Sequence, residues 1–503
     1  MIPRPTSRTD AATQPLNSAV SSPPTFSDKP TVWPLYVVTF LATYTIAVAS
    51  ISAPGIQHAL GIPDTQTSLV VGSYSATFAA GLIIFGRLGD RWGRRRLFRF
   101  GTAGLAVTSV LVACAPSLGL LVAARLLQGI AAAITTPQIL SSIQSILTGS
   151  TRLRAVGLYA VFAGSGTVGG QVMGGIVNSA FGETYGWRAA FASVTLAAIF
   201  AWVGSRYLTE SRSPAPLGLD VRGSVILAVA LLLMIAGLTN AAAINLVDPL
   251  SSVEPLVTTA ILLAGALLCF ILLVPHSKSR ERSSRPSILP VDVVREPGVR
   301  IGMALACLLF MMIGGFMYNF AILSQVGFGF SPLESGLSMV ILALAFILTS
   351  ALAPRLVARL GGTANGGRKI LIIASVVQGL GLAGLGLISL FDTDVTTFIV
   401  WFQIPALFIG GGQGLMMGPL ISVIMAAVPD EVAGLTGGLV ATGQQTGIGL
   451  GVAVLSSVFA GLGQMMPMQI AYGWTALGTL LLTVIFGFLA ARLGAYGSEK
   501  NAA

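Results

Sequence analysis

The chain has 503 residues, of which 54% are hydrophobic and only 9% are charged. A soluble domain carries about 25% charged residues, so this chain cannot cover a water-facing surface with ordinary charge. Its 60 glycines point the same way, because glycine is commoner in membrane-spanning helices than in soluble ones. The composition excludes a soluble globular protein and predicts an all-α protein that crosses a membrane many times.

Apolar runs follow one another along almost the whole chain after a polar beginning. Residues 1–32 are rich in Ser, Pro and Thr and lack the apolar core of a cleavable signal peptide, so we expect a disordered cytoplasmic tail. A helix needs about 20 apolar residues to cross the hydrocarbon core. Fourteen such runs lie near 33–57, 67–86, 97–114, 117–140, 154–178, 187–207, 221–240, 255–274, 301–323, 332–353, 369–390, 396–427, 432–461 and 472–493.

Basic residues indicate the orientation of these runs. If residue 1 lies inside, 26 of the 28 Lys and Arg fall on cytoplasmic tails, loops or adjoining helix ends. The exceptions are Arg188, in an outer connection, and Arg125, inside the fourth run. This is the positive-inside bias of membrane proteins. It explains the formal net charge of +10 without nucleic acid, and it predicts a multi-pass protein of the cell membrane with both termini cytoplasmic.

An internal repeat divides the chain. Residues 86–93 (GRLGDRWG) join the second and third runs, and residues 354–361 (PRLVARLG) join the tenth and eleventh runs in the same frame. Parallel repeats of this kind build some transporters. We therefore expect an N-terminal six-helix half at 33–208 and an inserted helix pair at 209–275. A cytoplasmic linker at 276–300, a C-terminal six-helix half at 301–493 and a cytoplasmic tail at 494–503 would follow.

The first copy of the repeat, extended to residue 96 (GRLGDRWGRRR), resembles the loop signature of the major facilitator superfamily. The glycines permit a tight turn, and the acid and arginines can form charge-assisted contacts. The resemblance implies a conformational, or gating, loop; the alternative is a merely basic loop beside the membrane. The residues that carry it are Gly86, Asp90, Arg91, Gly93 and Arg94.

The fourth run holds an arginine at mid-helix, where contact with lipid would be unfavourable. Residues 124–132 (ARLLQGIAA) resemble the second signature of the superfamily's drug exporters. A mid-helix arginine costs about 2.5–3.5 kcal/mol on insertion scales, so Arg125 should face a polar interior. Gln128, about one turn further on, could share its hydrogen bonds. The resemblance implies a role in proton coupling or substrate binding; the alternative is an arginine that snorkels to the membrane edge.

The fifth run is rich in glycine and resembles the antiporter signature, in which glycines flank a glycine–proline pair. Gln171 stands where the family has proline. Small residues four apart let helices approach closely, so a packing role does not need the proline kink. The residues of this glycine helix are Gly166, Gly170, Gln171, Gly174 and Gly175.

The chain after residue 32 is similar to the fourteen-span drug:proton antiporter family, with one departure. Thr45 occupies the position where that family usually has an aspartate, and all eighteen Asp and Glu fall in tails, loops or helix ends. A carboxylate is the usual carrier of a coupling proton. Asp90 or Asp220, near the inner face, could carry the proton instead, or the protein is not proton-coupled.

The family analogy places a substrate cavity between the halves near the midplane. Candidate lining residues are the polar and aromatic ones of the spans concerned: Tyr44, Thr45, Tyr74, Gln138, Tyr318, Asn319, Gln403, Gln413, Gln444 and Gln445, with Met416 and Met417 as adaptable apolar lining.

The leading hypothesis is an exporter of amphipathic small molecules such as antibiotics, driven by protons through alternating access. The alternative is a uniporter or differently coupled carrier of a metabolite or lipid. A membrane enzyme is disfavoured, because the two histidines, His58 and His276, fall at opposite faces. We expect a monomer in the lipid bilayer that binds a small molecule and a proton, and no nucleic acid, cofactor or metal.

Overall fold

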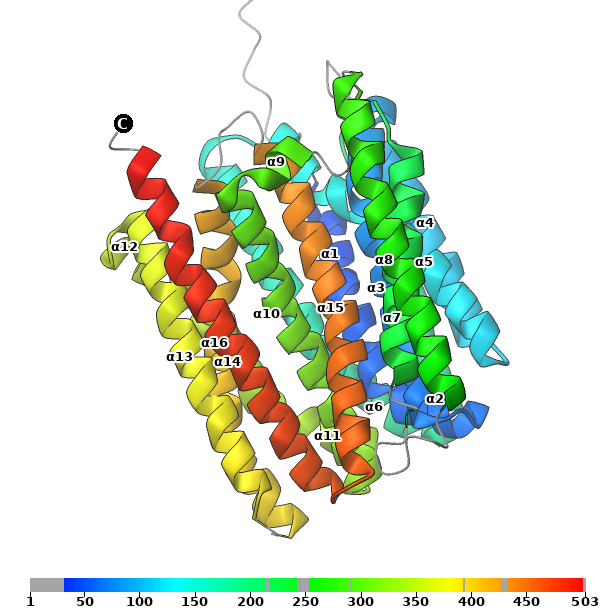
Figure 1. Ribbon diagram of the computed structural model, residues 1–503. Coiled ribbons are helices and arrows are strands. Elements are labelled where there is room, and N and C mark those ends of the chain that lie inside the picture. Colours follow the sequence, from blue (N-terminus) through cyan, green and yellow to red (C-terminus); the bar gives the residue numbers. More distant parts are fainter. Residues whose placement is uncertain are drawn as a thin grey trace, which may run out of the picture.

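The structure is a computed structural model in which residues 31–500 are described, apart from 213–217, 242–243, 245–252, 284, 289–290, 392–393 and 427–432. The expected tail at 1–32 thus lies almost wholly outside the described residues. The described elements are helices, and Figure 1 shows the long ones standing side by side in one bundle. The expected all-α membrane fold is confirmed.

The N-terminal half contains five long helices and one short helix, α2. The helices are α1 (Trp33–Ile51), α2 (Ala53–Leu60), α3 (Asp64–Trp92), α4 (Arg94–Ala113), α5 (Leu118–Ile146) and α6 (Gly149–Gly204), followed by a 3-10 turn at Ser205–Tyr207. Helix α6 is broken at Gly182, whose φ of 72° and ψ of 174° are not helical. It therefore supplies both the fifth and the sixth predicted spans.

The inserted pair is α7 (Val221–Ala241) and α8 (Val253–Arg282). The C-terminal half follows as α9 (Val291–Arg295), α10 (Pro297–Ile322), a π-helical turn at Leu323–Gly327, α11 (Pro332–Ser338), α12 (Val340–Arg359), α13 (Gly362–Ser389), α14 (Val395–Ala426), α15 (Ala433–Gly463) and α16 (Met468–Lys500). Much of the expected linker at 276–300 is thus helical, and α16 continues past residue 493.

Thirteen helices of the described chain are long and apolar enough to cross a membrane. The first part of α6, where the fifth span is expected, is not among them. This segment is nevertheless helical, and it packs along the whole of α1. Its glycines and Gln171 lower its mean hydropathy, although it still exposes large apolar side chains such as Val161, Met173 and Ile176.

The two halves repeat the same packing. Helix α1 packs chiefly on α6 and α10 chiefly on α15, while α5 packs on α3 and α4 as α14 packs on α12 and α13. The turns of the sequence repeat also match, because Gly93 and Gly361 both have positive φ, 106° and 116°. Only glycine adopts such values without strain.

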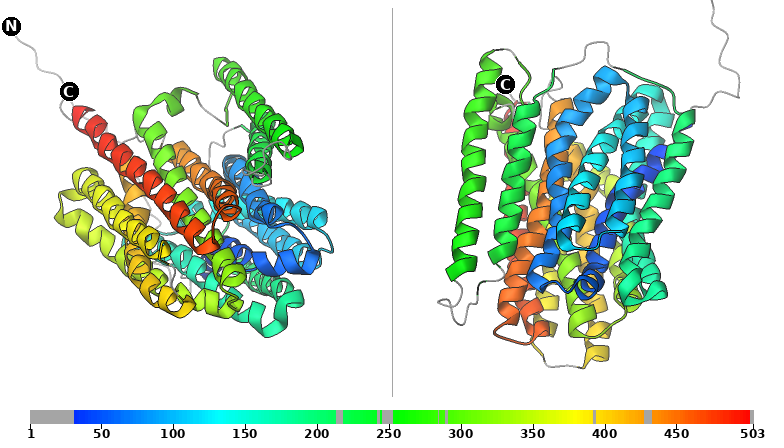
Figure 2. Two further views of the ribbon diagram at one scale, coloured as in Figure 1. Left: turned by 60° about the horizontal axis from the view of Figure 1, so that its bottom comes forward. Right: turned by 90° about the vertical axis from the view of Figure 1, so that its right-hand side faces the viewer.

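The inserted pair lies outside the two halves. Helices α7 and α8, in green, stand beside the bundle in both views of Figure 2. Helix α7 packs on α3 and α15, whereas α8 packs mainly on α7.

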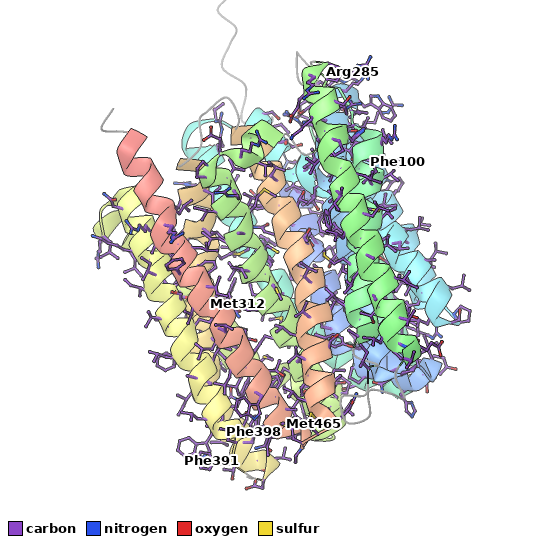
Figure 3. All side chains as sticks on the ribbon, viewed as in Figure 1. Phe100, Arg285, Met312, Phe391, Phe398 and Met465 are labelled. Carbon is purple, nitrogen blue, oxygen red and sulfur yellow. The ribbon has the colours of Figure 1, made fainter. Side chains whose placement is uncertain are left out.

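Large apolar side chains cover the outside of the bundle. Phe100 on α4 and Phe391 after α13 are 69% and 66% exposed, and Figure 3 shows both projecting from the periphery. Water-soluble monomers rarely expose large contiguous apolar patches, so this surface fits lipid. Arg285 lies at the end of the bundle that carries the C-terminus, and Met465 lies at the opposite end.

Candidate functional site

A cavity lies between the two halves. It is lined by residues of α1 and α6 from one half and of α10, α11, α12 and α14 from the other. The seventeen lining residues are Thr43, Ala163, Gly164, Thr167, Val168, Gln171, Val172, Phe310, Ile313, Met317, Gly336, Met339, Leu342, Ala343, Phe346, Gln413 and Met417. None of these residues carries a charge, so the cavity is an apolar chamber with a few polar groups.

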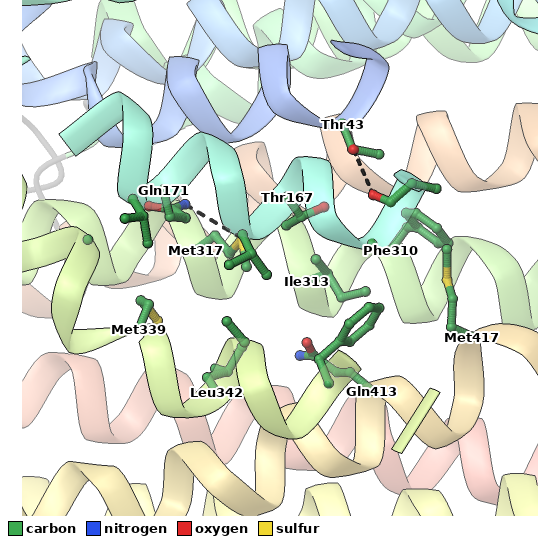
Figure 4. Close-up of a pocket in the computed structure, with 17 residues that line it drawn as sticks. Thr43, Thr167, Gln171, Phe310, Ile313, Met317, Met339, Leu342, Gln413 and Met417 are labelled. Carbon is green, nitrogen blue, oxygen red and sulfur yellow. Dashed lines mark hydrogen bonds between the residues drawn. The ribbon is translucent and has the colours of Figure 1, made fainter. Parts of the chain in front are cut away.

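Three of the polar groups in this cavity have spare hydrogen-bonding capacity. Gln171, 3% exposed, donates from Nε2 only to the sulfur of Met317 at 3.6 Å, a weak acceptor, while its Oε1 accepts nothing from the described residues. Gln413, 2% exposed, and Thr167 make no side-chain hydrogen bond within the described chain. Figure 4 shows the two glutamines on opposite sides of the cavity.

The hydroxyl of Thr43 is occupied, and this leaves Thr167 free. Thr43 Oγ1 donates to the carbonyl of Ala163 at 2.7 Å. That carbonyl, four residues before Thr167, is the one to which a helical threonine ordinarily donates. Thr167 and Gln171 therefore present their polar groups from the same face of α6, one turn apart.

Arg125 lies inside the N-terminal half and does not line the cavity. Its side chain is 0% exposed. It donates from Nε to the carbonyl of Val70 at 2.8 Å and from Nη1 to Gln128 Oε1 at 2.6 Å, and its guanidinium lies 4.4 Å from the ring centre of Tyr74. Gln128 in turn donates to Ser109 Oγ at 2.8 Å. Within the described chain no carboxylate pairs with this arginine, so neutral oxygens and an aromatic ring hold its charge.

Gln413 occupies the position in the C-terminal half that Gln128 occupies in the N-terminal half. Each precedes a glycine that packs directly on a backbone carbonyl: Gly129 on that of Tyr74, and Gly414 on that of Phe346. The residue four before Gly129 is Arg125, whereas Gly410 stands four before Gly414. With no arginine to hold, Gln413 is left to face the cavity.

The loop signature forms the turn between α3 and α4. Asp90 Oδ1 accepts from Arg94 Nη2 at 2.8 Å and from Arg94 Nε at 3.1 Å, and Arg94 Nη1 donates to the carbonyl of Ser141. Gly93 ends α3 at its positive φ, while Gly86 lies close to Pro137 and Arg91 is exposed.

Glu210, which sequence reasoning missed, caps this turn. Its carboxylate accepts the backbone N–H groups of Arg95 at 3.0 Å and Arg96 at 3.2 Å. An acid at a helix N-terminus satisfies free donors there and complements the helix dipole. In the sequence Glu210 is an acid in the cytoplasmic connection between the sixth and seventh runs, far from the turn that it caps.

The glycine helix lies mainly against α1. A Cβ on Gly166, Gly170 or Gly174 would meet α1 side chains or backbone, while one on Gly175 would meet the backbone of Pro332. These positions account for the close packing of α1 and α11 on α6.

Most of the other predicted cavity residues lie elsewhere. Tyr44 bonds Ser193 at 2.9 Å, Thr45 donates to the carbonyl of Leu41, Asn319 donates to that of Leu455, and Gln403 donates to that of Ile399. Those bonds lie within one half or one helix. Tyr74 packs against Arg125, and Gln138 donates to the carbonyl of Phe85. Tyr318, Gln444, Gln445 and Met416 are likewise not among the lining residues, whereas Gln413 and Met417 are.

Asp220 anchors the linker rather than facing the cavity. It is 2% exposed and accepts from His276 Nε2 at 2.9 Å and from the backbone of Gly223 and Ile288 at 2.9 and 3.0 Å. Burial alone would raise its pKa, but these hydrogen bonds and nearby Arg280 hold the pKa below its usual value. Asp220 therefore stays ionised at neutral pH, which is unsuitable for carrying a proton there.

Hydrogen bonds join the two halves near one end of the bundle. Gln325 donates to the carbonyl of Ile51 at 3.0 Å, and the backbone N–H of Leu333 donates to Ser179 Oγ at 2.9 Å. Both bonds lie near α2 and α11, at the lower end in Figure 1, opposite the C-terminus.

Two repeated halves with an apolar cavity between them define a membrane transporter. The family model of the Major Facilitator Superfamily matches residues 35–253 and 224–452. The chain belongs to the major facilitator superfamily.

Curated relatives support this assignment. A probable actinorhodin transporter of Streptomyces coelicolor is 30% identical over 421 residues, which cover 82% of this chain and 69% of that protein. A puromycin resistance protein of Streptomyces alboniger is 29% identical and covers 90% and 86%. Among solved structures, the xylose transporter of E. coli in an inward open conformation has a TM-score of 0.59 at 15% identity, covering 90% and 95%. At that identity the likeness shows the fold alone.

Proposed function

We propose that this protein exports amphipathic small molecules of the antibiotic class by alternating access. The observation that carries the proposal is the uncharged cavity between the halves, in which apolar walls surround a few free polar groups. Such a chamber suits a ligand with an apolar body and a small number of hydrogen-bonding groups. The names of the two Streptomyces relatives, a transporter and a resistance protein, fit the same direction of transport.

The energy source is the proton gradient in this proposal. Resemblance to drug:proton antiporters supports it, as does the buried position of Arg125, because ionisable residues inside a membrane are costly and commonly functional. The substrate and the coupling proton would not share a carboxylate, since none lines the cavity. A protonation site elsewhere would then act through the equilibrium between the two states.

The missing cavity carboxylate also favours a second candidate, a uniporter or differently coupled carrier of a metabolite or lipid. The two candidates differ in one respect. An antiporter accumulates substrate against its gradient only while protons flow, whereas a uniporter equilibrates it.

Everted membrane vesicles separate these candidates. Vesicles with the protein should accumulate compounds from a panel of neutral and charged antibiotics, and an uncoupler should abolish the accumulation; vesicles without the protein are the control. Uptake unaffected by the uncoupler would support the uniporter. No uptake of any compound would contradict export.

We further place the protein in the cell membrane as a monomer with both termini cytoplasmic. The end of the bundle with the C-terminus and Arg285 would then be the inner end. In a cysteine-free background, a cysteine beside Arg285 should be shielded from an impermeant thiol reagent in intact cells, and one beside Met465 should react. The reverse pattern would overturn the orientation.

A further inference from the structure

Three polar groups of the cavity lack a strong hydrogen-bond partner among the described residues. Thr167 and Gln171 come from α6 of the N-terminal half, and Gln413 comes from α14 of the C-terminal half. Figure 4 shows Ile313 between them, with Phe310 and Leu342 to either side. The polar groups thus lie on two sides of a mainly apolar cavity.

Gln171 and Gln413 are buried, whereas Thr167 is half-buried. A ligand that hydrogen-bonds such groups in an apolar chamber gains affinity from each bond. A carboxamide offers a donor and an acceptor, and so does a hydroxyl. None of these three groups carries a charge, and no charged side chain is among the residues that line the cavity. A cation entering this chamber would lose hydration without gaining a counter-ion.

We propose that the cavity selects uncharged compounds that have an apolar body and carry hydrogen-bonding groups on opposite edges. Thr167 and Gln171 bond one edge, Gln413 bonds the other, and the apolar body lies against the apolar residues between them. Because one glutamine comes from each half, a bound ligand bridges the halves. This inference names the substrate class and so rests on the proposed function.

The position of Gln413 is independent support. In the N-terminal half the corresponding glutamine, Gln128, is used up by Arg125 and Ser109. The C-terminal half has glycine at the arginine's position, and its glutamine reaches the cavity instead. The repeated glutamine thus holds other side chains in the N-terminal half, as Gln128, and supplies a ligand-binding group in the C-terminal half, as Gln413.

Binding to purified protein tests the inference with two dyes of the same ring system. Acridone is neutral, with a carbonyl on one edge and an N–H on the opposite edge, while 10-methylacridinium is a permanent cation that has neither group. Fluorescence titration should show acridone binding more than about tenfold tighter, the effect of at least one well-made hydrogen bond. Equal affinities, tighter binding of the cation, or no acridone binding would overturn the proposal.

Variants locate the binding. Gln171→Leu and Gln413→Leu should each weaken acridone binding by about fivefold to tenfold. Gln378→Leu is the matched control, because Gln378 is also buried but bonds Met312 and Thr483 outside the cavity. Loss of binding in the control alone, or full binding in both cavity variants, would contradict the assignment.

Gln413→Glu gives a result that misfolding cannot produce. A carboxylate at this position should make 10-methylacridinium bind tighter than it binds the wild type. No gain of cation binding in a variant that unfolds at the wild-type temperature would count against the cavity as the selective site. These binding outcomes are independent of the vesicle assay. If the protein binds acridone but the vesicles take up no compound, export is refuted and the binding site is still supported.

Discussion

Arg125 and Gln128 form a pair whose energetics can be measured by a double-mutant cycle. Arg125→Met keeps the length of the side chain and removes its charge. The two hydrogen bonds lost are charge-assisted and contribute about 1.5–3 kcal/mol each. The charge removed costs about 2.5–3.5 kcal/mol in the membrane interior. The free energy of unfolding of Arg125→Met should therefore lie between slightly above that of the wild type and about 3.5 kcal/mol below it.

Gln128→Leu should behave differently, because it leaves the buried guanidinium of Arg125 without its acceptor at 2.6 Å. The expected loss is about 1–3 kcal/mol. In the Arg125→Met background no charge is left unsatisfied, so the same substitution should cost less, with a coupling energy of about 1–2 kcal/mol. Thermal and denaturant unfolding of the four purified proteins in detergent measures the cycle.

Transport supplies the second measurement on the same four proteins. If Arg125 works in the transport cycle, Arg125→Met should slow uncoupler-sensitive uptake by about tenfold or more, the factor that one charge-assisted bond represents. Additive unfolding energies would refute the pairing. Wild-type transport by Arg125→Met would refute a role for the arginine beyond packing.

Two further substitutions test packing and the linker. Gly129→Val should destabilise the protein by about 1–3 kcal/mol or more and lower its yield, since a Cβ there overlaps the carbonyl of Tyr74; Gly478→Val, which enters open space, should not. Asp220→Asn should lower the unfolding temperature. Because its folded pKa is depressed, the stability that Asp220 contributes is present above about pH 4 and is lost as the pH falls through the folded pKa, so the difference from wild type should shrink in acid. Thermal unfolding at several pH values checks the predictions for Gly129→Val and Asp220→Asn. A difference between Asp220→Asn and the wild type that grows in acid would contradict the prediction for Asp220.

The spans could be predicted because each depends on local composition. Apolar runs and the side on which basic residues fall place the helices, and the shared frame of the repeat places the turns at Gly93 and Gly361. Boundaries were less predictable. Helix α8 continues to Arg282 because Lys278, Arg280 and Arg282 are good helix formers, so polar composition there did not mean a loop.

The cavity could be predicted only in part. The spacing of Arg125 and Gln128 sufficed to relate them, since residues three apart on a helix are neighbours. In contrast, α14 is apolar on all sides, so its sequence does not tell which face meets the other half. That is why Gln403 and Gln413 could not be distinguished. Thr167 was missed because its freedom depends on Thr43, which lies on another helix.

Closure of the two halves over the cavity is tested most directly by joining them at the end where they already meet. In a cysteine-free protein, Ser179→Cys and Leu333→Cys place thiols on two neighbouring residues of opposite halves, since the backbone N–H of Leu333 lies 2.9 Å from Ser179 Oγ. Joining these thiols with a short bifunctional reagent should stop transport, and a reagent cleavable by reductant should allow it to resume; either single variant should transport throughout. Undiminished transport by the joined protein would contradict alternating access between these halves.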